Sequence, residues 1–263
     1  MAATGRLPGT VMVTGGASGI GRASAEACAR LGAAVAVVDL DPDQAAMVAD
    51  ELEGAGAPSA IGIGCDIRDE AQVEAAVAVA GEELGNVRGL VACAGIDRGG
   101  LAHELPLEVW SQVIDVNLTG TFLVCKHVLA AMVAHGKGGS LVCASSPVAK
   151  LAVRGGASAY CASKGAVSAL VRTLAVDYAE HGIRVNAIVP GTTETPLMWA
   201  NVPAAEVDDV RATIRKQVAL GRLAQPAEIA EGIVWLLGDH SSYVTGTHLD
   251  VDGGLGATAH IEA

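Results

Sequence analysis

The sequence predicts an α/β fold in which helices cover both faces of a doubly wound parallel sheet. Two observations carry this prediction. Short apolar runs alternate with longer amphipathic segments along nearly all of the 263 residues, and glycine ends most of the apolar runs. Strands that are separated by helices form βαβ units, whose parallel sheet is buried on both faces. Because 51% of the residues are apolar and only 3% are aromatic, we expect a core of small aliphatic side chains.

The elements follow from these patterns in chain order. The run "TVMVTG" is typical of a strand, and the helical spacing after it ends at a glycine. Asp41 is expected to cap the next helix, with Pro42 in its first turn. The predicted strands are 10–15, 34–41, 60–67, 89–95, 140–146, 184–191 and 247–254. The predicted helices are 21–32, 42–53, 69–84, 106–135, 158–181 and 226–237.

The chain shows no sign of a second domain. We find no linker or low-complexity tract, so residues 1–263 are interpreted as a single domain. The segment 192–225 is the longest interruption of the pattern and indicates a helical insertion that caps a substrate cleft. Within it, Leu197, Met198 and Trp199 form either an apolar wall for a substrate or the packing face of a lid helix.

The composition favours a soluble, cytoplasmic protein that handles small molecules. A net charge of −12 argues against a nucleic-acid partner, because duplex binding requires a basic face. No basic segment followed by an apolar one opens the chain, and no apolar run approaches the roughly 18 residues of a membrane span. The scattered cysteines lack metal-ligand spacing, so we expect reduced thiols and no metal site. They are Cys28, Cys65, Cys93, Cys125, Cys143 and Cys161.

A glycine-rich turn joins the first strand to the first helix. Gly15, Gly19 and Gly21 stand in "TGGASGIG", with a strand before them and a helix after them. Glycine lets the backbone approach a pyrophosphate closely, and the helix N-terminus offers N–H groups to the anion. A tight turn that binds nothing is the alternative. The context of the glycines favours a dinucleotide site.

Asp39 ends the second predicted strand and indicates which dinucleotide is bound. A carboxylate here accepts the hydrogen bonds of an adenosine ribose diol and repels a 2′-phosphate. The positions that would carry a cation for that phosphate hold Ser18 and Leu40. The prediction is NAD(H) rather than NADP(H).

Tyr160 and Lys164 stand four residues apart in "SAYCASKGAV" and therefore share one helix face. A tyrosine with its ordinary pKa near 10 is a poor base at neutral pH. The nearby ammonium and a positively charged nicotinamide are expected to lower that pKa. Tyr160 is then the general acid and base for interconverting an alcohol and a ketone.

Further motifs follow in order: "DVNLTG" at 115–120, "VNAIVPG" at 185–191 and "VTGTHLDVDGG" at 244–254. With the T-G-x-x-x-G-x-G turn and the tyrosine–lysine pair, they resemble the short-chain dehydrogenase/reductase family from Thr14 to about Gly254. The resemblance implies a Rossmann-like fold, an NAD-dependent oxidoreductase acting on a secondary alcohol or ketone, and a homotetramer built on the helices at 106–135 and 158–181. The sequence departs from the N-N-A-G motif that is common in the family: residues 92–95 read Ala-Cys-Ala-Gly.

The same resemblance assigns site residues. The implied catalytic set is Asn117, Ser146, Tyr160 and Lys164. The cofactor-binding set is Gly15, Ser18, Gly19, Ile20, Gly21, Asp39, Leu40, Asp66, Ile67, Ala94, Gly95, Tyr160, Lys164, Pro190, Gly191 and Thr195. Ser145 stays an alternative to Ser146, because the spacing to the tyrosine is one residue longer than the family's usual one. Asn117 is implied to hold a water that relays protons from Lys164.

The substrate is less determined by the sequence. Arg98, His103, Lys150 and Arg154 stand in loops near the expected cleft, where they either pair with an anionic group or remain solvated. Cys93 is either a reactive thiol beside the nicotinamide or an inert buried one. The alternatives to a secondary-alcohol dehydrogenase are a 3-ketoacyl reductase acting on a carrier-protein or CoA thioester and, in another class, a non-catalytic dinucleotide sensor or scaffold.

Overall fold

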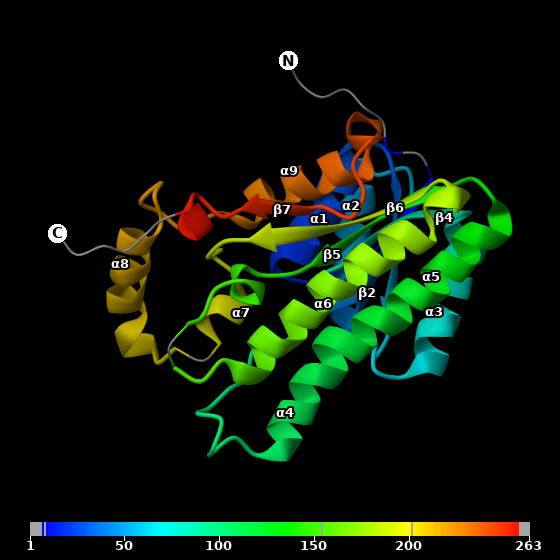
Figure 1. Ribbon diagram of the computed structural model, residues 1–263. Coiled ribbons are helices and arrows are strands. Elements are labelled where there is room, and N and C mark those ends of the chain that lie inside the picture. The colour runs from blue at the N-terminus through cyan, green and yellow to red at the C-terminus, as the bar shows by residue number, and fades with distance from the viewer. Residues whose placement is uncertain (1–6, 8, 154, 201, 258–263) are drawn as a thin grey trace.

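The computed structural model describes residues 7, 9–153, 155–200 and 202–257. It contains a seven-stranded sheet in the order β3-β2-β1-β4-β5-β6-β7 (Figure 1). Every neighbouring pair of these strands is parallel. The strands are β1 (Thr10–Thr14), β2 (Ala34–Asp39), β3 (Ala60–Gly64), β4 (Val87–Ala92), β5 (Gly139–Ala144), β6 (Ile183–Pro190) and β7 (His248–Val251). The predicted fold class is confirmed, with strand bounds shifted by a few residues.

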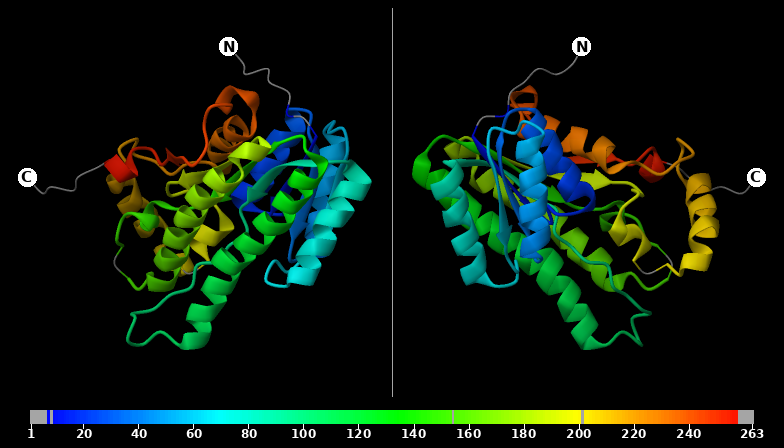
Figure 2. Two further views of the ribbon diagram at one scale, coloured as in Figure 1. Left: turned by 45° about the vertical axis from the view of Figure 1, so that its right-hand side comes forward. Right: turned by 180° about the vertical axis from the view of Figure 1, so that it is seen from behind.

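Helices cover the sheet on both faces (Figure 2). They are α1 (Gly19–Arg30), α2 (Pro42–Gly54), α3 (Glu70–Leu84), α4 (Leu107–Ile114), α5 (Thr121–His135), α6 (Ser158–Asp177), α7 (Pro196–Trp199), α8 (Val207–Gln217) and α9 (Pro226–Leu237). The alternating side chains of β1 divide the core. Val11 and Val13 pack with α1, α2 and α9 on one face, whereas Met12 packs with α3, α5 and α6 on the other.

The strand order reverses beside β1, and this reversal places the site. The chain runs from β1 to β2 and β3 on one side, then crosses to β4 on the other side of β1. In open parallel sheets, a crevice forms outside the carboxyl ends of the strands where the order reverses. The turns that follow β1 and β4 therefore border the crevice.

The predicted helix at 106–135 is continuous but contains a π-helical segment, Asp115–Gly120, between α4 and α5. Such a segment inserts an extra residue into the helix and is frequent at functional sites. Here it carries the buried Asn117, whose side chain bonds Ile96 and Ser163. Gly120 packs closely against the loop that follows β3. A Cβ on Gly120 would lie 2.6 Å from Cδ1 of Ile67.

The stretch Leu107–His135 is long and apolar enough to cross a membrane by length and composition, which corrects the expectation that no such stretch exists. Half of its apolar window is buried inside the protein. Val124, Val128 and Met132 of α5 belong to the core that α3 and α6 share. A core helix meets the same length criterion, so the stretch is weak support for a membrane span.

The segment after β6 carries α7 and α8 away from the sheet (Figure 1). Ile214, Val218 and Leu223 form a small apolar cluster of their own, against which Met198 and Trp199 pack. A bridge between Thr193 and Ala224 closes the base of the segment. The segment thus has its own small core above the carboxyl end of the sheet.

Candidate active site

A cavity of about 470 Å³ opens where the strand order reverses. Its walls are the turns that follow β1, β2, β3 and β4, together with the start of α7. Most of the residues that the sequence assigned to the cofactor line it. They are Gly15, Ser18, Gly19, Ile20, Gly21, Asp39, Leu40, Asp66, Ile67, Ala94, Gly95 and Thr195.

The glycine turn has a shape that other residues would not allow. Gly15 and Gly19 have φ values of +65° and +52°, in the left-handed region that favours glycine. A Cβ on Gly21 would lie only 2.0 Å from the carbonyl oxygen of Gly15. The side chain of Ser18, at the N-cap of α1, makes no capping hydrogen bond. The first turn of α1 therefore presents backbone N–H groups to the cavity at the positive end of the helix dipole.

Asp39 stands at the end of β2 and turns its carboxylate toward the glycine turn. Its Oδ2 accepts a hydrogen bond from the N–H of Ala17 at 3.0 Å, and its Oδ1 accepts one from the N–H of Leu40 at 2.8 Å. Each carboxylate oxygen can accept a second hydrogen bond. Asp39 thus braces the turn and keeps acceptor capacity for a diol.

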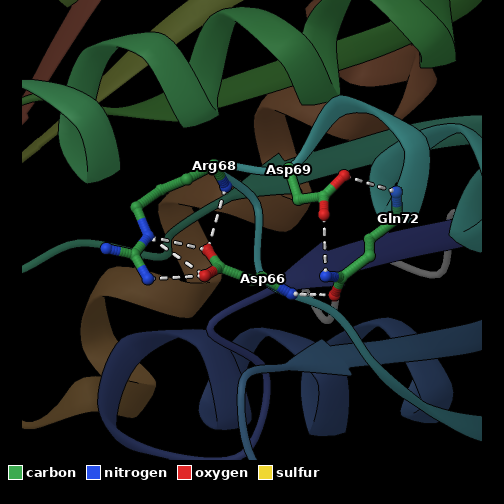
Figure 3. Close-up of polar contacts among 4 residues, drawn as sticks. All are labelled: Asp66, Arg68, Asp69 and Gln72. Carbon is green, nitrogen blue, oxygen red and sulfur yellow. Dashed lines mark hydrogen bonds and ion pairs between the residues drawn. The ribbon is translucent and has the colours of Figure 1, made fainter.

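Asp66 is held by two neighbours that the sequence reading missed (Figure 3). The Arg68 guanidinium donates from Nε and Nη2 to the Asp66 carboxylate at 2.6–3.1 Å. The N–H of Asp66 donates to Oε1 of Gln72 at 3.0 Å, and Gln72 in turn donates to Asp69 at 3.0 Å. The hydrogen bonds from Arg68 lower the pKa of the Asp66 carboxyl. Asp66 therefore stays ionised in a fixed orientation.

Tyr160 and Lys164 lie on one face of α6, beside the loop that follows β4. Nζ of Lys164 lies 5.6 Å from the centroid of the Tyr160 ring. It donates a hydrogen bond to the carbonyl oxygen of Ala144 at 2.8 Å. Lys164 is only 5% exposed, and burial lowers the pKa of its ammonium to about 8. Lys164 therefore remains mostly charged at neutral pH.

The expected lowering of the pKa of Tyr160 is wrong when only the protein's own groups act on it. Burial, followed by the negative charge of Asp97, raises the pKa of Tyr160 to about 12, while a hydrogen bond with Ser146 opposes that shift. The Lys164 ammonium lies against the ring and bonds Ala144, so its charge does not offset the burial of the phenol. Tyr160 is accordingly protonated at neutral pH.

The two adjacent serines point to different places. Oγ of Ser145 lies 2.7 Å from Oγ of Ser168 and donates to the carbonyl oxygen of Lys164 at 3.3 Å, so it packs under α6. Ser146 hydrogen-bonds the Tyr160 side chain and accepts from the N–H of Val148 at 3.4 Å. Of the two, Ser146 is the one that stands with the tyrosine.

Asn117 connects the loop after β4 to α6. Its Oδ1 accepts from the N–H of Ile96 at 2.8 Å, and its Nδ2 donates to the carbonyl oxygen of Ile96 at 2.9 Å and to Ser163 at 3.1 Å. A Cβ on Gly95 would lie 3.2 Å from Oδ1 of Asn117 and 3.7 Å from Nζ of Lys164. Asn117 is therefore at the site, with both N–H donors used by the protein.

The loop after β6 packs against the glycine turn that follows β1. The methyl group of Thr195 lies 3.3 Å from where a Cβ of Gly19 would stand. Oγ1 of Thr195 accepts from the N–H of Met198 at 3.2 Å and so caps α7. Pro190 ends β6, and the N–H of Gly191 donates to Val251 at 3.0 Å. Of the residues assigned to the cofactor, Pro190, Gly191, Tyr160 and Lys164 are not among those that line the cavity.

The remaining candidates divide clearly. Arg98 lines the cavity and donates to Gln112 at 2.9 Å. His103 pairs with Glu104 on an exposed loop, and Lys150 lies 3.5 Å from Asp250. Arg154 lies outside the described residues.

Met198 and Trp199 pack in the cluster around α8, as the packing interpretation expects. Leu197 lines the cavity. Burial raises the pKa of the Cys93 thiol to about 12, which favours the inert interpretation. Within the described ranges, no group of three or more His, Cys, Asp or Glu side chains could hold a metal ion.

Comparison with known proteins identifies the family. Residues 15–256 match the family model described as enoyl-(acyl carrier protein) reductase. A short-chain type dehydrogenase/reductase from Mycobacterium marinum has a similar structure, with a TM-score of 0.90 and 34% identity over 96% of this chain and 97% of that one. The chain belongs to this family of short-chain dehydrogenases/reductases.

Two relatives carry named activities. The chain is 43% identical to cis-4-hydroxycyclohexanecarboxylate dehydrogenase of Sinomonas cyclohexanicum, over 94% of this chain and 96% of that one. It is 39% identical to 2,5-dichloro-2,5-cyclohexadiene-1,4-diol dehydrogenase of Sphingobium indicum, over 94% and 97%. The protein is accordingly an oxidoreductase that acts on CH–OH donors and interconverts a secondary alcohol and a ketone.

Proposed function

We propose that the protein is an NAD(H)-dependent, cytoplasmic dehydrogenase of small secondary alcohols, with Tyr160 as general acid and base. The observation that carries the proposal is the pairing of Tyr160 with Ser146 beside a cavity that Asp39 lines. Neither member of the pair lines the cavity, but Lys164, on the same helix face as Tyr160, adjoins it, since a Cβ on Gly95 would lie 3.7 Å from its Nζ. The pair has the groups to move a proton, and Asp39 is the carboxylate that suits a ribose diol.

The residues present fit a dinucleotide. The turn after β1 leaves no room for a side chain at Gly21, and α1 begins without a side-chain cap, so an anion can approach its backbone N–H groups. Asp39 lies at the edge of the same turn and would repel the 2′-phosphate of NADP(H). Asp66 would meet the adenine, held in place by Arg68. A bound nicotinamide supplies the hydride acceptor and, when oxidised, a positive charge near the phenol.

The chain's own residues then handle the proton. Ser146 holds the substrate oxygen, and Tyr160 accepts the hydroxyl proton as a hydride leaves the carbinol carbon. In the reverse direction, Tyr160 donates its proton to the oxygen of the ketone. With a pKa of about 12, the Tyr160 phenol carries the proton that the donor role requires. The acceptor role needs an added positive charge, which an oxidised nicotinamide beside the phenol would supply.

Substitution of Tyr160 tests the proposal. Tyr160→Phe should lower kcat for alcohol oxidation by at least about a thousandfold, because removing the proton acceptor leaves only water to take the proton. Its Kd for NADH should stay within about twofold of the wild-type value. Tyr243→Phe is the matched control, since Tyr243 is fully exposed. Turnover that survives in the Tyr160 variant would remove this residue from its role.

The cofactor preference has its own test. Asp39→Ala should reduce the preference for NADH over NADPH by about 10-fold or more, because it removes both the diol acceptor and the repulsion of the phosphate. Fluorescence titration with the two cofactors measures the ratio. An unchanged ratio would contradict the assignment of Asp39 to the ribose.

A homotetramer is the proposed assembly, with the helices at 107–135 and 158–177 packed against partner copies. Exposed apolar side chains on these helices support it: Leu107 is 71% exposed, Phe122 45% and Val176 78%. Light scattering that finds a monomer at micromolar concentration would refute it.

A further inference from the structure

The acceptor positions of the Asp66 carboxylate are all taken by one neighbour. Oδ1 accepts from the backbone N–H and from Nε of Arg68 at 3.0 and 2.9 Å, and Oδ2 accepts from Nε and Nη2 of Arg68 at 3.1 and 2.6 Å. An ionised carboxylate offers about four lone-pair positions, and these contacts fill them. Asp39, which lines the same cavity, accepts one hydrogen bond at each oxygen and so keeps free positions.

Arg68 is itself part of the cavity wall. It lines the cavity together with Asp66 and Ile67, and its side chain is 47% exposed. Figure 3 shows its remaining nitrogen, Nη1, turned away from the carboxylate. Within the part of the chain that the structure describes, Nη1 makes no hydrogen bond. The wall therefore presents N–H donors at the point where a free aspartate would present acceptors.

The backbone of Asp66 is held independently of the Arg68 side chain. The N–H of Asp66 donates to Oε1 of Gln72 at 3.0 Å, and its carbonyl oxygen accepts from the N–H of Asp69 at 3.0 Å. Asp69 in turn caps α3 (Figure 3). Removing the Arg68 side chain should therefore leave Asp66 in place and free its carboxylate.

A carboxylate and a guanidinium distinguish purines at position 6 in opposite ways. Adenine carries an amino group there, which donates hydrogen bonds, whereas a 6-oxopurine carries a carbonyl oxygen, which accepts them. A free carboxylate favours the amino group and repels the oxygen. A guanidinium donates to that oxygen and to the ring nitrogens of either base.

We propose that Arg68 is a specificity-determining residue that lowers the preference of the site for adenine over a 6-oxopurine, because it occupies the Asp66 carboxylate and presents its own N–H groups to the base. The inference rests on the proposed function, in which Asp66 lies beside the adenine of a dinucleotide. It differs from a purely structural role of the pair, since the loss of such a role would weaken the binding of both bases equally.

Two dinucleotides that differ in the base separate these roles: NADH and reduced nicotinamide hypoxanthine dinucleotide. Fluorescence titration gives the Kd of each, and the ratio of the two Kd values measures the preference for adenine. The ratio is compared among the wild type, Arg68→Ala and the double variant Arg68→Ala/Asp66→Ala. Arg30→Ala is the matched control, because Arg30 also binds a carboxylate, that of Glu231 at 2.6 Å, but does not line the cavity.

Arg68→Ala should raise the preference for NADH by about 10-fold or more, because the freed carboxylate can then accept a hydrogen bond from the amino group. The double variant should lose this gain, and Arg30→Ala should match the wild type. An unchanged or lower preference in Arg68→Ala, or a gain that persists in the double variant, would overturn the inference alone. A wild type that binds neither dinucleotide would overturn the proposed function and this inference with it.

Discussion

The helices that follow the first three strands, α1, α2 and α3, begin in different ways. At α2 and α3, an aspartate occupies the N-cap and accepts two backbone N–H groups: Asp41 from residues 43 and 44, and Asp69 from residues 71 and 72. At α1, Ser18 occupies the N-cap and its side chain accepts none. Two of these helices thus have backbone N–H groups of their first turns bonded by the N-cap side chain, and α1 does not.

The difference teaches where the chain gives up local stability for binding. A missing cap costs a helix roughly 0.5–2 kcal/mol, and α1 adds a turn in which Gly19 must adopt a positive φ. Both features expose N–H groups at the positive end of a helix dipole, where an anion binds favourably. Asp39 supports the turn from outside through Ala17, without occupying the N–H groups of the helix. The helix that lacks a cap is therefore the one prepared for a phosphate.

The largest effect is expected from filling the turn. In Gly21→Ala, the new Cβ would fall 2.0 Å from the carbonyl oxygen of Gly15, so the turn must open. We expect NADH binding to be lost and the free energy of unfolding to fall by about 2–4 kcal/mol. Fluorescence titration and urea unfolding measure the two. Gly81→Ala is the control, because nothing lies within 4 Å of its Cβ and a helical alanine should stabilise α3.

A charged cap should convert α1 into a helix like its neighbours. Ser18→Asp places an acceptor and a negative charge where the phosphates would bind. Two unit charges about 4 Å apart repel by roughly 4 kcal/mol near a protein surface, so NADH affinity should fall at least about 100-fold. The thermal midpoint without cofactor should rise, because the first turn is then capped.

Ser18→Asn is the matched control for this prediction. Asparagine caps a helix about as well as aspartate but carries no charge, so it should raise the midpoint and keep most of the affinity for NADH. Equal affinity in the aspartate variant and the wild type would mean that no phosphate binds at this helix end.

How far the sequence could predict these features depends on the range of the interactions. The strands, the glycine turn and the Asp41 cap follow from residues a few positions apart, and the structure contains all three. The choice between Ser145 and Ser146 needed α6, because only its packing shows which hydroxyl group is covered. Spacing along the chain could not decide it.

The sign of the Tyr160 pKa shift was beyond the sequence for a similar reason. Its largest cause is burial, and its second is Asp97, which lies 63 positions earlier. The loop that carries Asp97 is held by hydrogen bonds of Ile96 to Asn117 and of Gly100 to Gly156. The pair of Tyr160 and Lys164 was visible as a four-residue spacing, but the direction of the lysine ammonium was not. Local patterns located the chemical groups, whereas tertiary contacts set their chemical properties.

The smallest effect is expected from removing a cap that binds no ligand. Asp41→Ala should lower the thermal midpoint by roughly 2–4 °C at neutral pH, while NADH affinity stays unchanged. Hydrogen bonds from Gln44 and Asp43 hold the pKa of Asp41 below its ordinary value of 3.8. A carboxyl with a lowered pKa stabilises the fold above the ordinary value, and this contribution is lost as the pH falls through the lowered one. The difference in thermal midpoint between variant and wild type should therefore persist at pH 5–7 and shrink below pH 3.8. A difference in midpoint that stays constant to lower pH, or a loss of NADH affinity in this variant, would contradict the contrast between α1 and α2.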